Sequence, residues 1–118
     1  MATIKSYTGI YQSKKLADIL SLESADMCFV NDGTAIKIDA NPYNVRKYMW
    51  KDVQVTPCWS LTALLGVLPE GYSFELTKSF DGKDYYCNLD GKPIKTIADN
   101  PVDACVAMIE KLNELNLL

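Results

Sequence analysis

The chain contains no histidine. This absence removes the commonest general base, every catalytic triad built on an imidazole and the commonest metal ligand. The six glycines are scattered, so the chain has no glycine-rich loop for binding phosphate. No run approaches the roughly 18 apolar residues that cross a membrane, and residues 1–15 lack the apolar core of a signal peptide. We therefore expect a cytoplasmic protein that does not interact with membranes.

The four cysteines are too far apart to suggest a metal site. They stand at positions 28, 58, 87 and 105, whereas a zinc site usually takes two of its ligands from one tight turn. Without an export signal, a framework of disulfides is not expected either. Free cysteine is among the most often buried residue types. The spacing therefore predicts four buried thiols, no metal and no cofactor.

Charge and composition are those of an ordinary folded domain. Apolar residues make up 48% of the chain and charged residues 23%, and 118 residues are enough for one core. We expect a single compact domain over residues 1–118. The net charge of −3 speaks against a general nucleic-acid binder, whose affinity comes from basic residues that neutralise phosphates.

The first half of the chain reads as one helix followed by three strands. Apolar residues at helical spacing predict a helix over Gln12–Leu22, with Ser13 as its N-cap. An Asx-Gly turn between Met27–Val30 and Thr34–Asp39 predicts a β-hairpin. Alternating side chains over Val45–Val55 predict a third strand.

The second half repeats this order and ends in a further helix. Thr56–Pro57 is a cap-and-proline start for a helix over Cys58–Leu68. Three strands and a last helix follow, at Tyr72–Thr77, Tyr85–Leu89, Pro93–Ile97 and from Asn100 onwards. The order α-βββ-α-βββ-α predicts an α+β fold with antiparallel sheets and helices packed on them. Near-equal offsets between the helix starts leave open a duplicated αβββ unit, although the two halves share little identity.

Two helices carry the predicted core. The helix after Pro57 is apolar on almost every side, and the last helix carries one apolar stripe. We expect the following side chains to be buried: Trp59, Leu64, Leu65, Val106, Ile109 and Leu112.

Catalytic candidates are few. Cys58 stands at the predicted start of a helix, where the helix N-terminus favours a thiolate, yet it has no histidine to pair with. Asp81, Asp84 and Asp90 cluster on the predicted hairpin turns, where aspartate also serves local hydrogen bonds. We assign no catalytic residue. A small enzyme or ligand-binding domain that uses these groups stays the alternative interpretation.

The segment Tyr43–Lys51 is rich in aromatic and basic side chains. Its large residues, Tyr43, Arg46, Tyr48 and Trp50, have the composition of a protein–protein hot spot. The same pattern suits a strand packed on a helix with solvated lysines, or a stacking surface for single-stranded nucleic acid, which the acidic charge disfavours. We expect a non-enzymatic interaction protein with a protein partner or a homodimer through Val45–Val55, and we identify no small-molecule ligand.

Three motifs carry a family resemblance. They are "YQSKKLADILSLESADM" from Tyr11, "TPCWSLTALLGVLP" from Thr56 and "DNPVDACVAMIEKL" from Asp99. Together they resemble a family of small uncharacterised proteins from phages and mobile elements of gut Bacteroidetes. The motifs are helix caps, core stripes and turns, so the resemblance implies a fold and a source and no catalytic activity. It suggests an accessory or host-modulating factor. Residues 35–55 do not match the family pattern.

Overall fold

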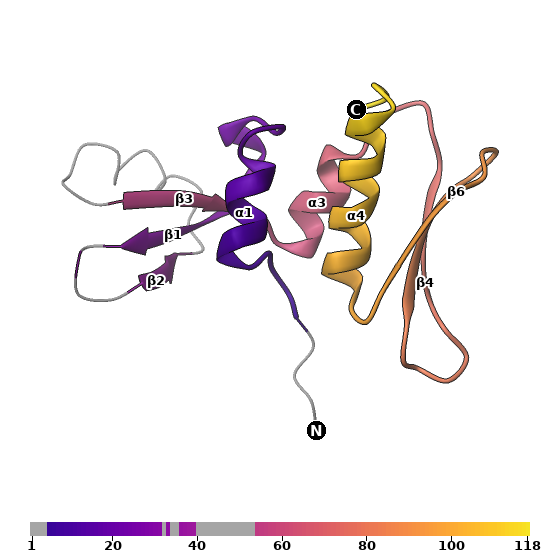
Figure 1. Cartoon of the computed structure of the whole chain (residues 1–118), viewed down its shortest axis with the longest axis horizontal. Coiled ribbons are helices and arrows are strands. Elements are labelled where there is room, and N and C mark those ends of the chain that lie inside the picture. Colours follow the sequence, from indigo (N-terminus) through magenta and orange to yellow (C-terminus); the bar gives the residue numbers. More distant parts are fainter. Residues whose placement is uncertain (1–4, 32, 34–35, 40–53) are drawn as a thin grey trace. The chain divides into compact units, whose positions relative to one another are not determined.

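The computed structural model confirms an α+β fold with two antiparallel sheets (Figure 1). It describes residues 5–31, 33, 36–39 and 54–118. The described elements follow the predicted order, with one added 3-10 turn. Most of the third predicted strand, Val45–Val55, lies outside the described residues, and the strand observed there is Gln54–Cys58. In chain order they are α1 (Ile10–Leu16), η1 (Leu22–Ser24), β1 (Met27–Asn31), β2 (Ile36–Asp39), β3 (Gln54–Cys58), α3 (Leu61–Val67), β4 (Phe74–Lys78), β5 (Tyr85–Leu89), β6 (Ile94–Ala98) and α4 (Pro101–Glu114).

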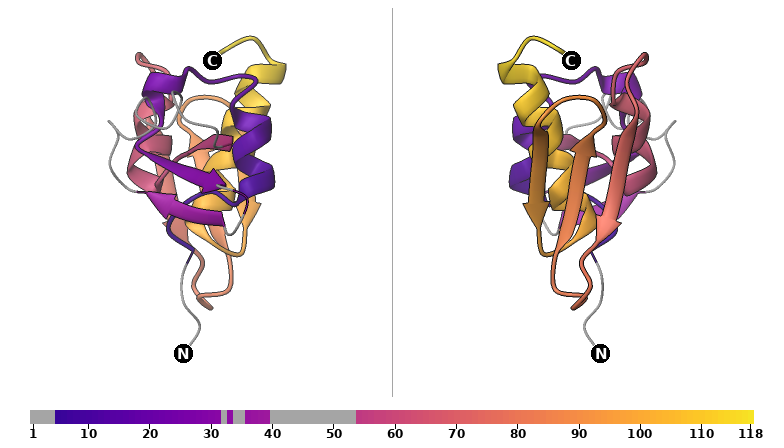
Figure 2. Two further views of the ribbon diagram at one scale, coloured as in Figure 1. Left: turned by 90° about the vertical axis from the view of Figure 1, so that its left-hand side faces the viewer. Right: turned by 90° about the vertical axis from the view of Figure 1, so that its right-hand side faces the viewer.

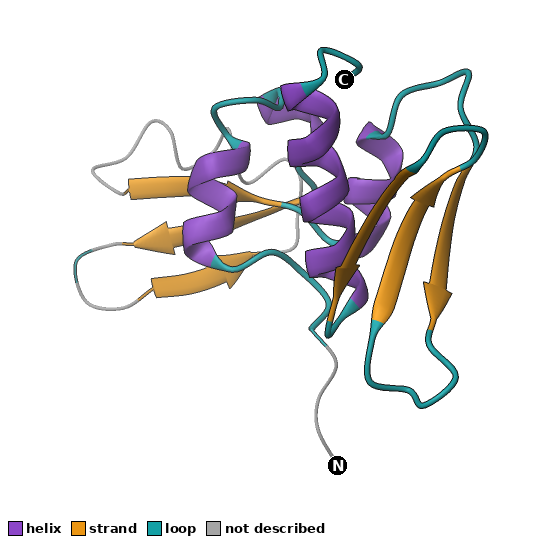
Figure 3. Cartoon of the chain, turned by 45° about the vertical axis from the view of Figure 1, so that its right-hand side comes forward, coloured by secondary structure: helices purple, strands orange, loops and turns teal. Residues whose placement is uncertain are grey.

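The chain divides into two compact units, and each holds one sheet (Figure 3). The first unit runs over Tyr7–Ala63, and the second joins Lys5 and Ser6 to Leu64–Leu118. The single domain expected over residues 1–118 stays a prediction. No helix in the described ranges is long and apolar enough to cross a membrane.

The first unit is built on the predicted β-hairpin. β1 pairs with β2 on one side and with β3 on the other, and both pairings are antiparallel. The hairpin turn depends on Gly33, whose φ of 93° places it in the left-handed region that suits glycine. Its N–H donates to Oδ1 of Asn31 at 3.0 Å, so the asparagine side chain completes the turn.

The helix of this unit begins earlier than predicted. α1 begins after Gly9, and the side chain of Gln12 accepts a hydrogen bond from the Gly9 N–H at 3.0 Å. Ser13, predicted as the N-cap, lies inside the helix and is buried. Its hydroxyl hydrogen-bonds to Thr8, on the segment before the helix. The Ser13 hydroxyl, which the local pattern assigned to a cap, therefore serves a buried hydrogen bond.

The predicted cap at Thr56–Pro57 is also wrong, because both residues belong to β3. Proline lacks a backbone donor, and it is tolerated there because β3 lies at the edge of the described sheet. Ser60 caps α3 instead: its hydroxyl oxygen accepts a hydrogen bond from the Ala63 N–H at 3.2 Å. The helix thus begins one residue after Ser60.

The second unit is a three-stranded meander covered on one face by α4. β5 lies at the centre, between β4 and β6, and α4 packs on β5 and β6 (Figure 2, right). The predicted start of the last helix is confirmed. Asn100 is its N-cap, with Oδ1 accepting from the Asp103 N–H at 2.8 Å, and Pro101 is the first helical residue.

Burial confirms the predicted core except at one position. Leu64 is fully buried, whereas Leu65, its neighbour on α3, is 43% exposed. The other predicted core side chains are all buried: Trp59, Val106, Ile109 and Leu112. The two sheets differ in topology, because the first strand is central in one and the second strand in the other. The halves therefore do not repeat one αβββ arrangement.

Candidate functional site

Cys58 lies in a closed network of hydrogen bonds rather than at a helix start. Its Sγ donates to the backbone oxygen of Thr8 at 3.4 Å and accepts from the Thr8 hydroxyl at 3.5 Å. The same hydroxyl oxygen accepts from the Trp59 N–H at 3.1 Å and lies 2.7 Å from Ser13 Oγ. Every polar atom in this network has a partner. Cys58 thus joins the segment before α1 to the end of β3.

The environment of Cys58 disfavours a thiolate. Burial is the dominant effect and raises the pKa of Cys58, although the hydrogen bonds from Thr8 and Ser13 act in the opposite direction. Burial likewise raises the pKa of Cys28 to about 11, with Asp39 and Cys58 adding to the effect. In the second unit, Cys105 donates to Cys87, so its own pKa is raised. All four cysteines are free and buried, which is the packing that the spacing predicted.

The structure does not bring the three hairpin aspartates together. Asp81 lies in the β4–β5 turn and accepts from the Ser79 hydroxyl at 2.7 Å and from the Lys83 N–H at 3.0 Å. The bond from Ser79 lowers the pKa of Asp81. Asp84 precedes β5, whereas Asp90 follows it, so they lie at opposite ends of that strand. Only Asp81 contributes its carboxylate to a turn, whereas Asp84 donates its backbone N–H to Ser79 Oγ in the same turn.

No metal site forms among the described residues, because no three histidine, cysteine, aspartate or glutamate side chains gather there. The described part of the chain also holds no buried side-chain nitrogen or oxygen atom without a hydrogen-bond partner. The predicted partner surface, Tyr43, Arg46, Tyr48 and Trp50, lies outside the described residues. It stays a prediction.

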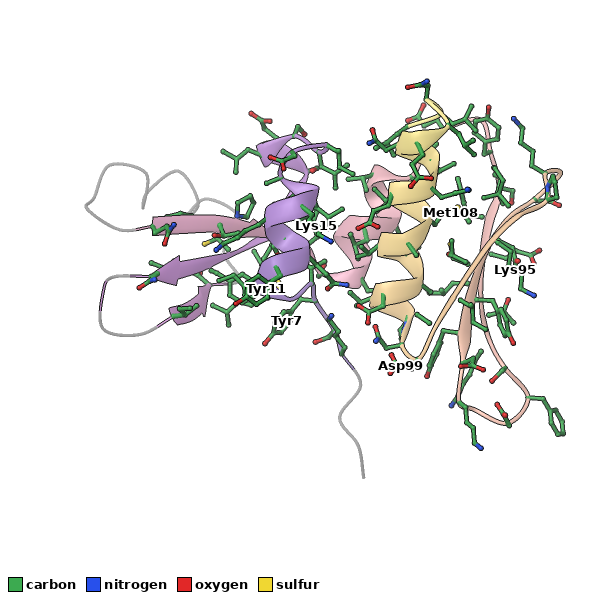
Figure 4. All side chains as sticks on the ribbon, in the orientation of Figure 1. Tyr7, Tyr11, Lys15, Lys95, Asp99 and Met108 are labelled. Carbon is green, nitrogen blue, oxygen red and sulfur yellow. The ribbon has the colours of Figure 1, made fainter. Side chains whose placement is uncertain are left out.

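An exposed apolar surface lies on one face of the first sheet. The register pairs Phe29 on β1 with Ile38 on β2, so both side chains point to the same face. Ile36 lies two residues before Ile38 on β2 and therefore points to this face as well. The ring of Tyr7 meets the ring of Phe29 edge to face, with centroids 6.4 Å apart. We call Tyr7, Phe29, Ile36 and Ile38 the β2 face; Tyr7 is labelled in Figure 4.

The apolar side chains of this face become more exposed from β3 through β1 to β2. Cys58 belongs to the same face, is buried and is hydrogen-bonded to Thr8, next to the helix. Phe29 is half-buried, whereas Ile38 is 39% and Ile36 is 56% exposed. α1 packs on β3, at the far side of the sheet from β2. The helix therefore leaves the β2 side of this face open.

Sequence reasoning missed the β2 face for a physical reason. The apolar–polar alternation of β2 indicates that one side of the strand is apolar, and such a side is normally the one that enters the core. Only the position of α1 shows that the helix does not cover the two isoleucines.

Comparison of the chain with protein-family models, with curated proteins and with solved structures finds no match.

Proposed function

We propose that this protein is a non-enzymatic interaction module that binds a partner protein on the β2 face. The observation that carries the proposal is the exposure of Ile36 and Ile38 beside the rings of Tyr7 and Phe29. Large apolar side chains gathered on one face are typical of protein interfaces, because binding removes their surface from water. The aromatic pair adds rigid contact area at a low cost in conformational entropy.

The alternative, an enzyme or ligand-binding domain, would use Cys58 or the hairpin aspartates. A nucleophilic cysteine needs a lowered pKa and access to substrate, whereas Cys58 is buried and its pKa is raised. Asp81 and Asp84 lie in one turn, where the Asp81 carboxylate accepts from Ser79 and Lys83, and Asp90 lies at the other end of β5. These observations favour the interaction module.

Source and location are part of the same proposal. A phage or mobile element of gut Bacteroidetes, which the sequence motifs suggest, would encode such a module as an accessory or host-modulating factor. Four free thiols are what a reducing compartment maintains, and they support the cytoplasmic location.

A crosslinking experiment tests the β2 face. A photoreactive phenylalanine analogue replaces Ile38 in the full chain, and the captured protein is identified from cells that carry the gene and then purified. We expect Ile38→Ser to weaken binding of the purified partner about tenfold or more, because a central apolar contact of an interface is lost. Leu115→Ser is the matched control, since Leu115 is 44% exposed at the end of α4.

Two results would overturn the proposal. One is binding of the purified partner that Ile38→Ser and Ile36→Ser leave unchanged. The other is crosslinking from position 115 that equals crosslinking from position 38. A parallel pair, Tyr48→Ala and Trp50→Ala, tests the surface predicted from sequence and separates it from the β2 face.

A further inference from the structure

The β4–β5 turn, residues 79–84, carries a phenylalanine that stands clear of the second unit. Phe80 is 111% exposed, more than any other large apolar side chain of the described residues. The turn extends past the first residues of α4, at the lower right of Figure 1. A phenyl ring in water forgoes the favourable free energy of burial. This side chain therefore adds nothing to the core of the unit.

Hydrogen bonds hold the backbone on both sides of Phe80. The Ser79 N–H donates to the backbone oxygen of Asp84 at 2.8 Å, and the Gly82 N–H donates to the backbone oxygen of Ser79 at 3.0 Å. Ser79 Oγ accepts from the Asp84 N–H at 3.0 Å and donates to Asp81 Oδ1 at 2.7 Å. Gly82 has a φ of 75°, in the left-handed region that favours glycine. The turn is thus fixed in one conformation.

This turn does not depend on an aromatic residue at position 80. Ser79 and Asp81 supply the side-chain hydrogen bonds, and Gly82 supplies the positive φ. Such turns are mostly built from small and polar residues. An exposed ring on a fixed turn loses little conformational entropy when a partner covers it, and aromatic side chains of this kind anchor protein interfaces. The turn therefore presents Phe80 as a preorganised anchor.

Two lysines of the hairpin end add positive charge. Lys78 is the last residue of β4, and its Cε lies 3.4 Å from the position that a Cβ on Gly82 would occupy, so its side chain lies against the turn. Lys83 is exposed on the turn itself. Neither ammonium group forms an ion pair with another described residue. The Asp81 carboxylate, in contrast, is engaged by the Ser79 hydroxyl and the Lys83 N–H. The hairpin end thus offers two unpaired ammonium groups together with the ring.

We propose that the β4–β5 turn inserts Phe80 into an apolar pocket of a partner protein, and that the rim of this pocket carries carboxylates. The pocket removes the ring from water, and the carboxylates complement the ammonium groups of Lys78 and Lys83. A membrane suits the turn less well. One ring buries too little apolar area to hold a protein on a bilayer, and anionic headgroups would repel the Asp81 carboxylate. The surface belongs to the second unit, and the proposal does not depend on the β2 face.

A crosslinking experiment on the full chain tests the anchor. A photoreactive phenylalanine analogue replaces Phe80, and the protein captured in cells that carry the gene is identified and purified. We expect Phe80→Ser to weaken binding of this purified partner about tenfold to a hundredfold, because the burial of one aromatic ring is lost. Thermal unfolding should be unchanged, because the ring is fully exposed. Ile97→Ser, at a position 55% exposed on β6 of the same unit, is the matched control and should bind like the parent.

Charge reversal tests the acidic rim with the same purified partner. Lys78→Glu and Lys83→Glu should each weaken binding about threefold or more, because attraction to the carboxylates becomes repulsion. Added salt should weaken binding of the parent protein more than binding of either variant. Lys92→Glu reverses an exposed charge in the β5–β6 turn, at the other end of β5, and should change little.

Four results would overturn the proposal. Position 80 could capture no protein more strongly than position 97 does. The purified partner could bind Phe80→Ser as tightly as the parent, or bind both lysine reversals as tightly as the parent. The parent alone could bind vesicles of phosphatidylserine and phosphatidylcholine in a manner that Phe80→Ser abolishes, which would assign the turn to a membrane. A partner whose binding Ile38→Ser weakens and Phe80→Ser does not would support the β2 face and count against this turn.

Discussion

Ser60 donates its backbone N–H to Oδ1 of Asp26 at 2.9 Å and its hydroxyl to Oδ2 of the same carboxylate. The Ser60 hydroxyl oxygen also accepts the Ala63 N–H. One carboxylate therefore orients the residue that caps α3 and ties it to the start of β1. The indole N–H of Trp59 reaches the same region, where it donates to Ser24 Oγ at 2.9 Å. The cap is thus set by residues more than thirty positions earlier in the chain.

Removing this carboxylate should destabilise the protein. We expect Asp26→Ala to lower the free energy of unfolding by about 1–3 kcal/mol, because the N–H and the hydroxyl of Ser60 both lose their acceptor. Urea denaturation measures the change. Asp18→Ala, at an exposed position after α1, is the control and should stay within about 0.5 kcal/mol of the parent. Equal losses in the two variants would contradict this account of the cap.

Two neighbouring leucines on α3 should respond very differently to truncation. Leu64 is fully buried and Leu65 is 43% exposed. We expect Leu64→Ala to cost about 2–5 kcal/mol, through lost burial and the cavity that remains. Leu65→Ala should cost less than about 1 kcal/mol. Urea denaturation of the two variants measures these losses of stability. If Leu64→Ala lost as little stability as Leu65→Ala, this helix would not support the core.

Thiol labelling should find four unreactive cysteines. All four are buried, and the reactive species is the thiolate, which raised pKa values disfavour at Cys28, Cys58 and Cys105. The hydrogen bond from Cys105 lowers the pKa of Cys87, so burial alone protects that thiol. We expect an aromatic disulfide reagent near neutral pH to react slowly with the native protein and rapidly with four thiols after denaturation. A fast phase assigned to Cys58 by peptide mapping would instead support the enzyme alternative.

Stability should fall at alkaline pH. The pKa of Cys28 rises from 9.0 to about 11 on folding, so the unfolded chain releases this proton at a lower pH than the native protein. The contribution of Cys28 is therefore complete below pH 9.0 and disappears as the pH rises through about 11. It amounts to about 2–3 kcal/mol at most. Urea denaturation at a series of pH values between 9.0 and about 11 measures this contribution.

The matching control is Cys28→Ala. Tyrosines and lysines also titrate in this range, so the parent and the variant are compared at each pH. Their stability difference should shrink as the pH rises. A difference that stays constant across the window would show that the Cys28 proton does not contribute.

Local signals in the sequence were enough to predict some parts of the fold. The Asx-Gly turn needs a residue that tolerates positive φ, so Asn31 and Gly33 specify the first hairpin on their own. The start of α4 depends on one side-chain bond at Asn100 and a proline beside it. The buried stripe of that helix follows from its 3.6-residue period, and the bounds of β5 were predicted without error.

Other features depend on which segments pack together in the folded chain, and local sequence patterns do not show this. Thr56–Pro57 resembles a helix cap, but pairing with β1 draws both residues into β3. Cys58 at a helix start would favour a thiolate, but the segment at Thr8 closes over it. Ile36, Ile38 and Leu65 have the spacing of core residues and are exposed. Periodicity fixes which side chains share a face, and only packing fixes how far that face is covered.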